Sequence, residues 1–330
     1  MSLNSFVSLI QAAIIFGTVI MYGCIGEIFS EKSGNLNLGV PGIMYIGGIS
    51  GLTSVFFYEG KVENPSGAVC VIIALLSCFA ASALAGLLYC FLVITLRANQ
   101  NVTGLTLTIF GSGIANFFGG SLMKLAGGVG QISVPVTSKA FRAKIPFLST
   151  ETGVVGKLFF SYGFMTYVAI ILAVVASLIL KKTKVGLNLR AVGESPQAAD
   201  AAGISVTKYK YFATTIGAGI CGMGGLFYVM DYIKGTWAND GTIEKLGWLA
   251  VALVIFTTWR PLNAIWGAYL FGVLYWMYFY MSGLTRASQE LFKMLPYVVT
   301  LIVLIIVSLR RKKENQAPAS LGLSYFREER

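Results

Sequence analysis

The sequence predicts an all-α, polytopic integral membrane protein with about nine transmembrane segments, some of them broken helices. Of its 330 residues, 56% are hydrophobic and only 12% are charged, whereas soluble domains carry about 25% charged residues. The apolar residues gather in stretches close to the roughly 20 residues that a helix needs to cross a bilayer. Only helices fit these stretches, because the backbone groups of an open strand stay unpaired in lipid.

The apolar stretches, in order along the chain, are 8–28, 40–57, 68–96, 101–119, 158–180, 209–230, 247–258, 262–281 and 291–309. Segment 68–96 is longer than one crossing requires, so it predicts a strong tilt or an extension beyond the membrane. Segment 247–258 is too short to cross alone. We interpret it as a half-helix, separated from the next segment by Trp259-Arg260-Pro261.

Two basic clusters determine the predicted orientation. One lies in loop 181–208, and the other is the run from Arg310 to Lys313 after the last segment. Because Lys and Arg favour the cytoplasmic side, both clusters belong inside. If 247–258 and 262–281 count as two passes, the N-terminus, with no Lys or Arg before Lys32, then belongs outside. The net charge of +11 is therefore explained by cytoplasmic loops, and we expect no nucleic-acid partner.

This orientation predicts one transmembrane domain, 1–310, followed by a cytoplasmic C-terminal tail, 311–330. The domain carries one informative cytoplasmic loop, 181–208. Its only large extracytoplasmic loop is 120–157, which contains two prolines and scattered apolar residues. We expect that loop to be a plain connector or a short interfacial helix that forms a lid or a docking surface.

Several functional classes are excluded by what the sequence lacks. With no histidine, the chain has no histidine-based acid–base catalysis, catalytic triad or histidine metal site. It has no GxxxxGK[ST] motif with which to cradle ATP phosphates. No acidic residue lies deep inside a predicted span, whereas ion-coupled carriers keep ionisable residues there; Glu27 is near the inner end of the first. We expect no catalytic residue, metal site or cofactor, and a protein that is not an enzyme.

A glycine motif inside the sixth segment also needs an interpretation. Residues 217–222 match GxGxxG, but no strand precedes them, so a dinucleotide site is excluded. Gly217, Cys221 and Gly225 recur at four-residue spacing, which places them on one helix face. Since small residues let membrane helices approach closely, we interpret this face as a packing surface.

The stretch from Ser33 to Gly51 combines two asparagines, a proline and repeated glycines at the start of an apolar span. It predicts irregular backbone entering the membrane, which is tolerated only where protein or a cavity pairs the backbone groups. Uncharged amide and hydroxyl groups suit an uncharged solute. The candidate residues of the solute pathway are Asn35, Asn37, Thr103, Thr106, Thr108, Asn116 and Phe110.

Thr103 and Thr106 are three residues apart and can share a helix face, whereas Thr108 points to another side. At most some of these residues can therefore line one pore. The alternative is that the threonines bond to their own helix backbone and the asparagines cap helices.

Loop 181–208 contains a predicted short helix. Ser195 is a helix cap, Pro196 is the first helical residue, and Gly203 stops the helix. A plain connector needs no such helix, and its small side chains permit a close fit into a groove of a soluble partner. The candidate docking residues are Glu194, Ser195, Pro196, Gln197, Ala198, Ala199, Asp200 and Gly203.

Three groups of motifs resemble, in order, those of the bacterial simple-sugar and nucleoside ABC importer permeases, within the ribose and branched-chain amino-acid permease superfamily. They are Gly34–Gly39 with Pro41–Met44, Leu189–Asp200 with Ala202–Ile204, and Ala252–Phe256 with Trp259–Leu262 and Gly267–Gly272. The resemblance covers the chain from the first to the last predicted span. Within the group, the chain resembles the shorter of the two permeases of a nucleoside importer. Pro41 departs from the family pattern, which has an acidic residue at this position.

The resemblance implies the ABC importer permease fold and a location in the bacterial cell membrane. The helix in loop 181–208 would be the coupling helix, seated in a separate ATP-binding subunit that drives the alternation between outward and inward openings. Other implied partners are a second, homologous permease subunit, forming a heterodimer, and an extracytoplasmic substrate-binding lipoprotein. The implied function is import of nucleosides. The alternatives are a simple-sugar permease of the same kind and a stand-alone channel or carrier.

Overall fold

A computed structural model describes residues 3–125, 132–144, 153–238, 240–281, 283, 285–310 and 316–326. The α-helices are α1 (Leu3–Lys32), α2 (Val40–Lys61), α3 (Gly67–Cys90), α4 (Gln100–Leu125), α5 (Pro135–Phe141), α7 (Gly153–Phe159), α8 (Phe164–Lys182), α9 (Lys184–Glu194), α10 (Pro196–Ala201), α11 (Val206–Phe227), α12 (Thr242–Phe256), α13 (Pro261–Trp276) and α14 (Arg286–Arg310). Two π-helical turns, η1 (Phe91–Thr95) and η2 (Tyr228–Tyr232), and a 3-10 turn, η3 (Met277–Tyr280), complete the described elements. The predicted all-α class is confirmed.

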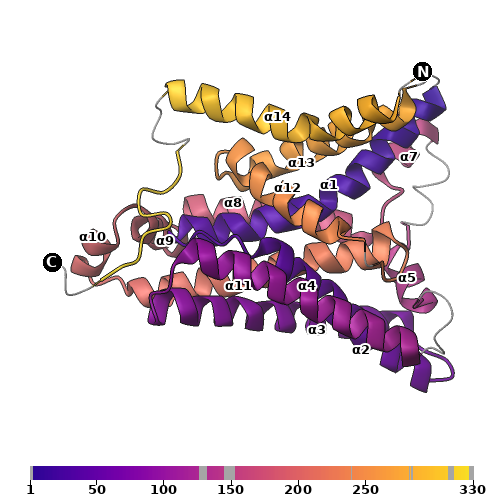
Figure 1. The fold of residues 1–330 in the computed structure, drawn as a ribbon, viewed down its shortest axis with the longest axis horizontal. Coiled ribbons are helices and arrows are strands. Elements are labelled where there is room, and N and C mark those ends of the chain that lie inside the picture. The colour runs from indigo at the N-terminus through magenta and orange to yellow at the C-terminus, as the bar shows by residue number, and fades with distance from the viewer. Residues whose placement is uncertain are drawn as a thin grey trace.

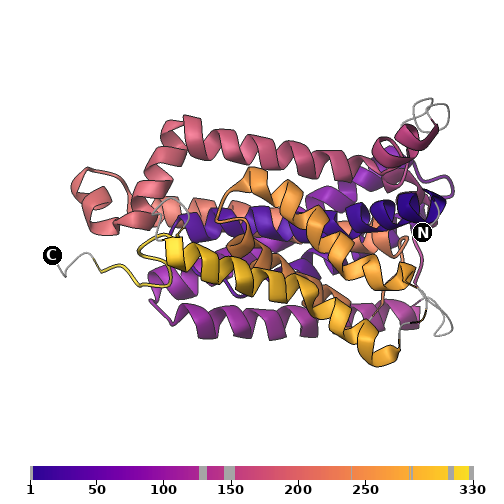
Figure 2. The same cartoon turned by 90° about the horizontal axis from the view of Figure 1, so that it is seen from above.

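The long helices run side by side along one axis, and the two ends of the bundle differ (Figure 1). The N-terminus, α5 and α7 lie at one end, which we call the outer end. The helices α9 and α10 and the C-terminus lie at the opposite end, the inner end, in both views (Figure 2). The two ends of the chain therefore face opposite sides of the bundle.

Within the described residues, seven helices are long and apolar enough to cross a membrane: α1, α2, α3 with η1, α4, α8, α11 with η2, and α14. The predicted apolar segments each coincide with a helix. Segment 68–96 is longer than a single span because α3 continues without a break into the π-helical turn η1. The two remaining segments form α12 and α13, which are shorter than a helix needs to be to count as a membrane span here. The expected number of nine transmembrane segments therefore stays a prediction.

The break between α12 and α13 follows the expected chemistry. Thr258 and Trp259 adopt left-handed backbone conformations, with φ of 53° and 55°, and Pro261 begins α13. The indole N–H of Trp259 donates to the carboxylate of Glu31 at the inner end of α1. Helix α13 then runs back along α1, where Ala268 lies against Gly17. The predicted half-helix is thus confirmed, and its break lies at the inner end.

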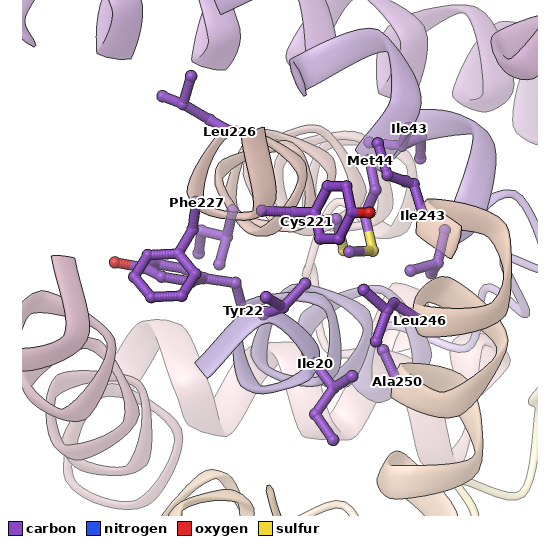
Figure 3. Close-up of a cluster of buried hydrophobic side chains, with 14 of the residues drawn as sticks. Ile20, Tyr22, Ile43, Met44, Cys221, Leu226, Phe227, Ile243, Leu246 and Ala250 are labelled. Atoms are coloured by element: carbon purple, nitrogen blue, oxygen red, sulfur yellow. The ribbon is translucent and has the colours of Figure 1, made fainter. Parts of the chain in front are cut away.

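The centre of the bundle is formed by α1, α2, α11 and α12 in close contact. Figure 3 labels core residues from all four helices, among them Tyr22, Met44, Cys221 and Leu246. The Tyr22 ring points away from the other three, toward Phe227, and its hydroxyl donates to the Met165 carbonyl oxygen of α8 at 2.7 Å. The expected packing face of α11 is also present, because a Cβ on Gly217 or Gly225 would collide with backbone of α1 or α2. Glycine at these positions is what allows the helix backbones to touch.

Candidate coupling surface and solute pathway

The predicted short helix is present as α10, and it projects from the inner end of the bundle (Figure 1). The Ser195 hydroxyl accepts a hydrogen bond from the backbone N–H of Ala198 at 3.3 Å, which caps the helix. Pro196 is its first residue, and Gly203, with φ of 80°, ends it. Local sequence chemistry therefore sets the two ends of this helix.

The candidate residues of α10 have two different environments. Pro196 and Ala199 face inward, and Ala199 packs with Val192 of α9 and Val206 of α11 in a small separate core. Gln197, Ala198, Gly203 and the preceding Glu194 are exposed. The exposed face is therefore mostly small and uncharged, while the other face fastens α10 to the bundle.

A C-terminal segment that we call the strap, residues 316–326, packs on this element. Ser320 donates from both its backbone N–H and its hydroxyl to the carbonyl oxygen of Gly193, at 3.0 and 2.6 Å. The Ala319 N–H donates to the Glu194 carboxylate at 3.4 Å, and the Tyr325 hydroxyl donates to Asp200 Oδ2 at 2.9 Å. Two acidic candidates for coupling are thus also partners of the strap.

Sequence reasoning treated residues 311–330 only as a tail and missed the strap. A usable indication was present, because residues 317–326 are uncharged and end in two aromatic residues, with three residues between them and the basic run that ends at Lys313. Such a stretch has apolar surface to bury, whereas a solvated tail does not.

The entry segment, residues 33–39 before α2, is irregular as expected and its two asparagines are buried. Residues 40–51, for which irregular backbone was also expected, are helical and belong to α2. Asn35 Nδ2 donates to the Thr214 hydroxyl at 2.9 Å. Asn37 Oδ1 accepts from the Gly39 N–H at 3.0 Å, and the Asn37 N–H donates to Glu27 Oε1 at 3.1 Å. Both asparagines therefore hold the entry segment in place, with Asn35 also lining a cavity at the inner end.

The candidates on α4 divide into two groups. Thr103 and Thr108 are buried, and their hydroxyls donate to the carbonyl oxygens of Asn99 at 2.8 Å and Leu38 at 3.0 Å. Thr106, Phe110 and Asn116 are exposed on the face turned away from α2. An added Cβ on Gly113 of that face would meet no atom within 4 Å.

Thr103 and Thr106, which can share a helix face by spacing, have different surroundings, because Thr103 is buried and Thr106 is exposed. Three residues of α-helix leave the two side chains about 60° apart. Helix α4 packs tightly on one side only, through Gly104 on Leu38 and Gly111 on Gly42. A 60° difference is enough to cross the edge of that contact, and Thr108 lies on the buried side with Thr103.

Two buried carboxylates were missed or underrated by sequence reasoning. Glu27 and Glu31 lie one turn apart on α1, and both are buried. They connect α1 to the entry segment, through Asn37, and to the break after α12, through Trp259. The indication in the sequence was their i, i+4 spacing on one helix face.

At the outer end, the described part of loop 120–157 forms the short helices α5 and α7. The Val134 N–H donates to the Gly235 carbonyl at 3.0 Å, and the Ser138 hydroxyl donates to the Met230 carbonyl at 3.0 Å. Beside α5 is a cavity of about 660 Å³, lined among others by Arg142, Asp231 and Lys234. This loop was expected to be either a plain connector or a short interfacial helix, and α5 is a short packed helix.

Comparisons with known proteins agree over nearly the whole chain. Residues 9–304 match the family described as "Branched-chain amino acid transport system / permease component". The chain is 31% identical to the guanosine ABC transporter permease protein NupQ of Bacillus subtilis, covering 98% of this chain and 97% of that protein. It is 29% identical to the nucleoside ABC transporter permease protein NupC of Lactococcus lactis, covering 98% of each.

A third relative carries a different printed substrate. The chain is 31% identical to the putative glucose ABC transporter permease protein TsgC13 of Haloferax volcanii, over 97% of this chain and 98% of that protein. No solved structure matches.

Proposed function

Since the chain belongs to the permease-component family of the branched-chain amino acid transport systems and is a multi-pass protein of the cell membrane, we propose that it is the transmembrane subunit of an ATP-driven, binding-protein-dependent importer of nucleosides. The observation that carries the coupling part of this proposal is α10. It is a capped helix with a small-residue exposed face, and it projects from the inner end.

The energy source lies on another chain in this proposal. The sequence has no phosphate-cradling loop motif, so ATP hydrolysis belongs to an ATP-binding subunit that receives α10 in a groove. Ala198 and Gln197 are exposed and would contact that groove. Ala199 would act indirectly, because its burial against Val192 and Val206 transmits a push on α10 into α9 and α11.

The exposed face of α4 is our candidate for the solute pathway. Thr106 and Asn116 supply uncharged hydrogen-bonding groups, and Phe110 supplies an aromatic surface on which a base can stack. Because this face has no partner within the described chain, a second, homologous permease subunit would complete the pathway. A substrate-binding lipoprotein would deliver solute at the outer end, near α5.

Nucleosides are favoured as the solute by two of the three relatives above, and a simple sugar is the second candidate. The relative named as a putative glucose permease supports the sugar. Hydroxyl and amide groups on α4 can bond to the sugar hydroxyls in either case, whereas Phe110 has a clear role only with a base.

Competition measures which solute is carried. The complete transporter, with ATP-binding subunit, second permease and binding protein, is reconstituted in proteoliposomes. The ATP-binding subunit faces the lumen, which contains ATP, and uptake of labelled guanosine is followed. We expect excess unlabelled nucleosides to abolish uptake and excess ribose or glucose to leave it unchanged. Labelled glucose uptake without nucleoside uptake would favour the sugar, and uptake without ATP would contradict an ATP-driven importer.

A further inference from the structure

A polar cavity of about 190 Å³ lies at the inner end, beneath the strap. Its walls come from the entry segment, η1, the start of α11 and strap residues 323–325. The exposed coupling face of α10 and the exposed face of α4 do not line this cavity, which shares only Asp200 with the docking candidates and Asn35 with the pathway candidates.

Lys210 lines the cavity and is the first reason to assign it a ligand. Its side chain is only 2% exposed. Among the described residues, no hydrogen bond or ion pair reaches its ammonium group. Burying an ammonium group without a counter-charge is costly. A ligand that carries negative charge would remove that cost.

The N-terminus of α11 faces the same cavity. Ser205, Val206 and Thr207 line it, and the Ser205 side chain makes no capping bond. The first backbone N–H groups of a helix have no acceptor within the helix, and the helix dipole adds positive potential there. Arg97, which lies over the Phe326 ring at 4.5 Å, adds a second cationic side chain to the lining. Donors and positive charge therefore converge from several elements.

The cavity also contains hydrogen-bond acceptors, and these restrict the class of ligand that can bind. Asn35 Oδ1 is buried without a hydrogen-bond partner among the described atoms, while the amide nitrogen of the same side chain donates to the Thr214 hydroxyl. Asp200, which accepts from Tyr325, places a carboxylate in the lining. A ligand must therefore offer a hydrogen-bond donor as well as negative charge. Hydrogen phosphate has both, whereas sulfate and the phosphodiester of a lipid headgroup have no donor at neutral pH.

We propose that this cavity is a binding site for inorganic phosphate. Lys210 and the N-terminal amides of α11 hold the anion, and Asn35 recognises its protonated form. The phosphate oxygens accept from the Lys210 ammonium and the first amides of α11, as anions do at other helix N-termini. The phosphate hydroxyl donates to Asn35 Oδ1. Arg97 attracts the anion at the rim. The site is independent of which solute the transporter carries.

The test measures equilibrium binding of radiolabelled phosphate to the full-length protein in nanodiscs of phosphatidylcholine. Lys210→Gln removes the buried ammonium, and Lys208→Gln is its matched control, because Lys208 is exposed two residues away and loses the same charge. We expect saturable binding to the wild type and to Lys208→Gln. Binding to Lys210→Gln should be roughly tenfold to a hundredfold weaker, the range for one lost hydrogen bond to a charged group. Equal binding by Lys210→Gln and the wild type would overturn the proposal.

Two further arms identify the ligand. Sulfate should compete at least about tenfold less well than phosphate, for lack of a donor to Asn35. Replacing part of the lipid by phosphatidylglycerol should leave phosphate binding unchanged. Equal competition by sulfate, or loss of phosphate binding in phosphatidylglycerol, would overturn the assignment to phosphate.

One variant keeps the test valid if Lys210→Gln does not fold. Arg97→Gln alters an exposed side chain, and thermal unfolding without phosphate will show whether it is folded. It should weaken phosphate binding several-fold, and the weakening should diminish as salt is added, because an exposed charge is screened. Unchanged affinity in this variant would contradict the charge arrangement we infer.

Discussion

Thr106 and Thr108 lie two residues apart on α4 and have opposite surroundings. Thr108 is buried and donates to the Leu38 carbonyl at 3.0 Å, whereas Thr106 is exposed. Sequence spacing could indicate that these hydroxyls differ in direction, but not which of them faces the neighbouring helix. Which hydroxyl faces inward depends on which side of α4 packs against the chain. The close contacts of Gly104 and Gly111 determine that side, and helical periodicity alone does not.

The pair makes a matched test of the pathway. Thr106→Ala should weaken the apparent affinity for solute by roughly tenfold to a hundredfold, since a lost partner in a dry site costs about 1–3 kcal/mol. Thr108→Ala should leave that affinity unchanged but lower the unfolding temperature, because the Leu38 carbonyl loses its partner. Both are read by concentration-dependent uptake with surface expression measured. Unchanged uptake kinetics in Thr106→Ala would remove α4 from the pathway.

Gly26 is a second position where one residue decides the packing. A Cβ there would collide with the carbonyl oxygen of Gly217 on α11. Gly26→Ala should therefore push α1 and α11 apart and cost at least about 1–3 kcal/mol, the usual range for overpacking. Gly60→Ala is the control, since no atom lies within 4 Å of its added Cβ. Thermal unfolding in detergent measures both, and equal stabilities would refute the close contact of α1 with α11.

At the scale of elements, α10 could be predicted almost residue by residue from sequence because its limits are local. Ser195, Pro196 and Gly203 act within a few residues of themselves. The strap could not be placed in the same way. Its partners, Gly193 and Asp200, are more than a hundred residues earlier in the chain, and no local pattern encodes them.

The two neighbouring alanines of α10 separate docking from folding. Ala198→Trp places a bulky group on the exposed face, so transport should fall to near background while stability is retained. Ala199→Trp overfills the small core with Val192 and Val206, so it should lower stability by about 1–3 kcal/mol. ATP-driven uptake and thermal unfolding are measured on both. Normal uptake by a folded Ala198→Trp transporter would show that α10 is not the coupling helix.

At the scale of the whole molecule, the apolar stretches predicted where the helices lie because bilayer thickness limits their length. The break at Trp259-Arg260-Pro261 followed from proline chemistry. The buried pair Glu27 and Glu31 was harder to foresee, since its burial depends on the entry segment and on Trp259 folding back over α1. Local rules predicted the elements, and long-range contacts determined the polar interior.

The orientation in the membrane is the prediction that belongs to this scale. Asn4 and Ala317 are exposed at opposite ends of the bundle. In a background without the native cysteines, Asn4→Cys should react with an impermeant thiol reagent from outside intact cells, and Ala317→Cys only after the cells are opened. Labelling of Asn4→Cys only from the cytoplasmic side would mean that α12 and α13 do not both act as passes.

The most direct test of the central claim, that an ATP-binding subunit seats on α10, is cross-linking in the assembled transporter. Ala198→Cys, in the background without native cysteines, is treated with a short bifunctional reagent, and Lys139→Cys on the exposed surface of α5 is the control at the outer end. The account predicts a covalent product between Ala198→Cys and the ATP-binding subunit, and none from Lys139→Cys. No product from position 198, or an equal yield from position 139, would contradict it.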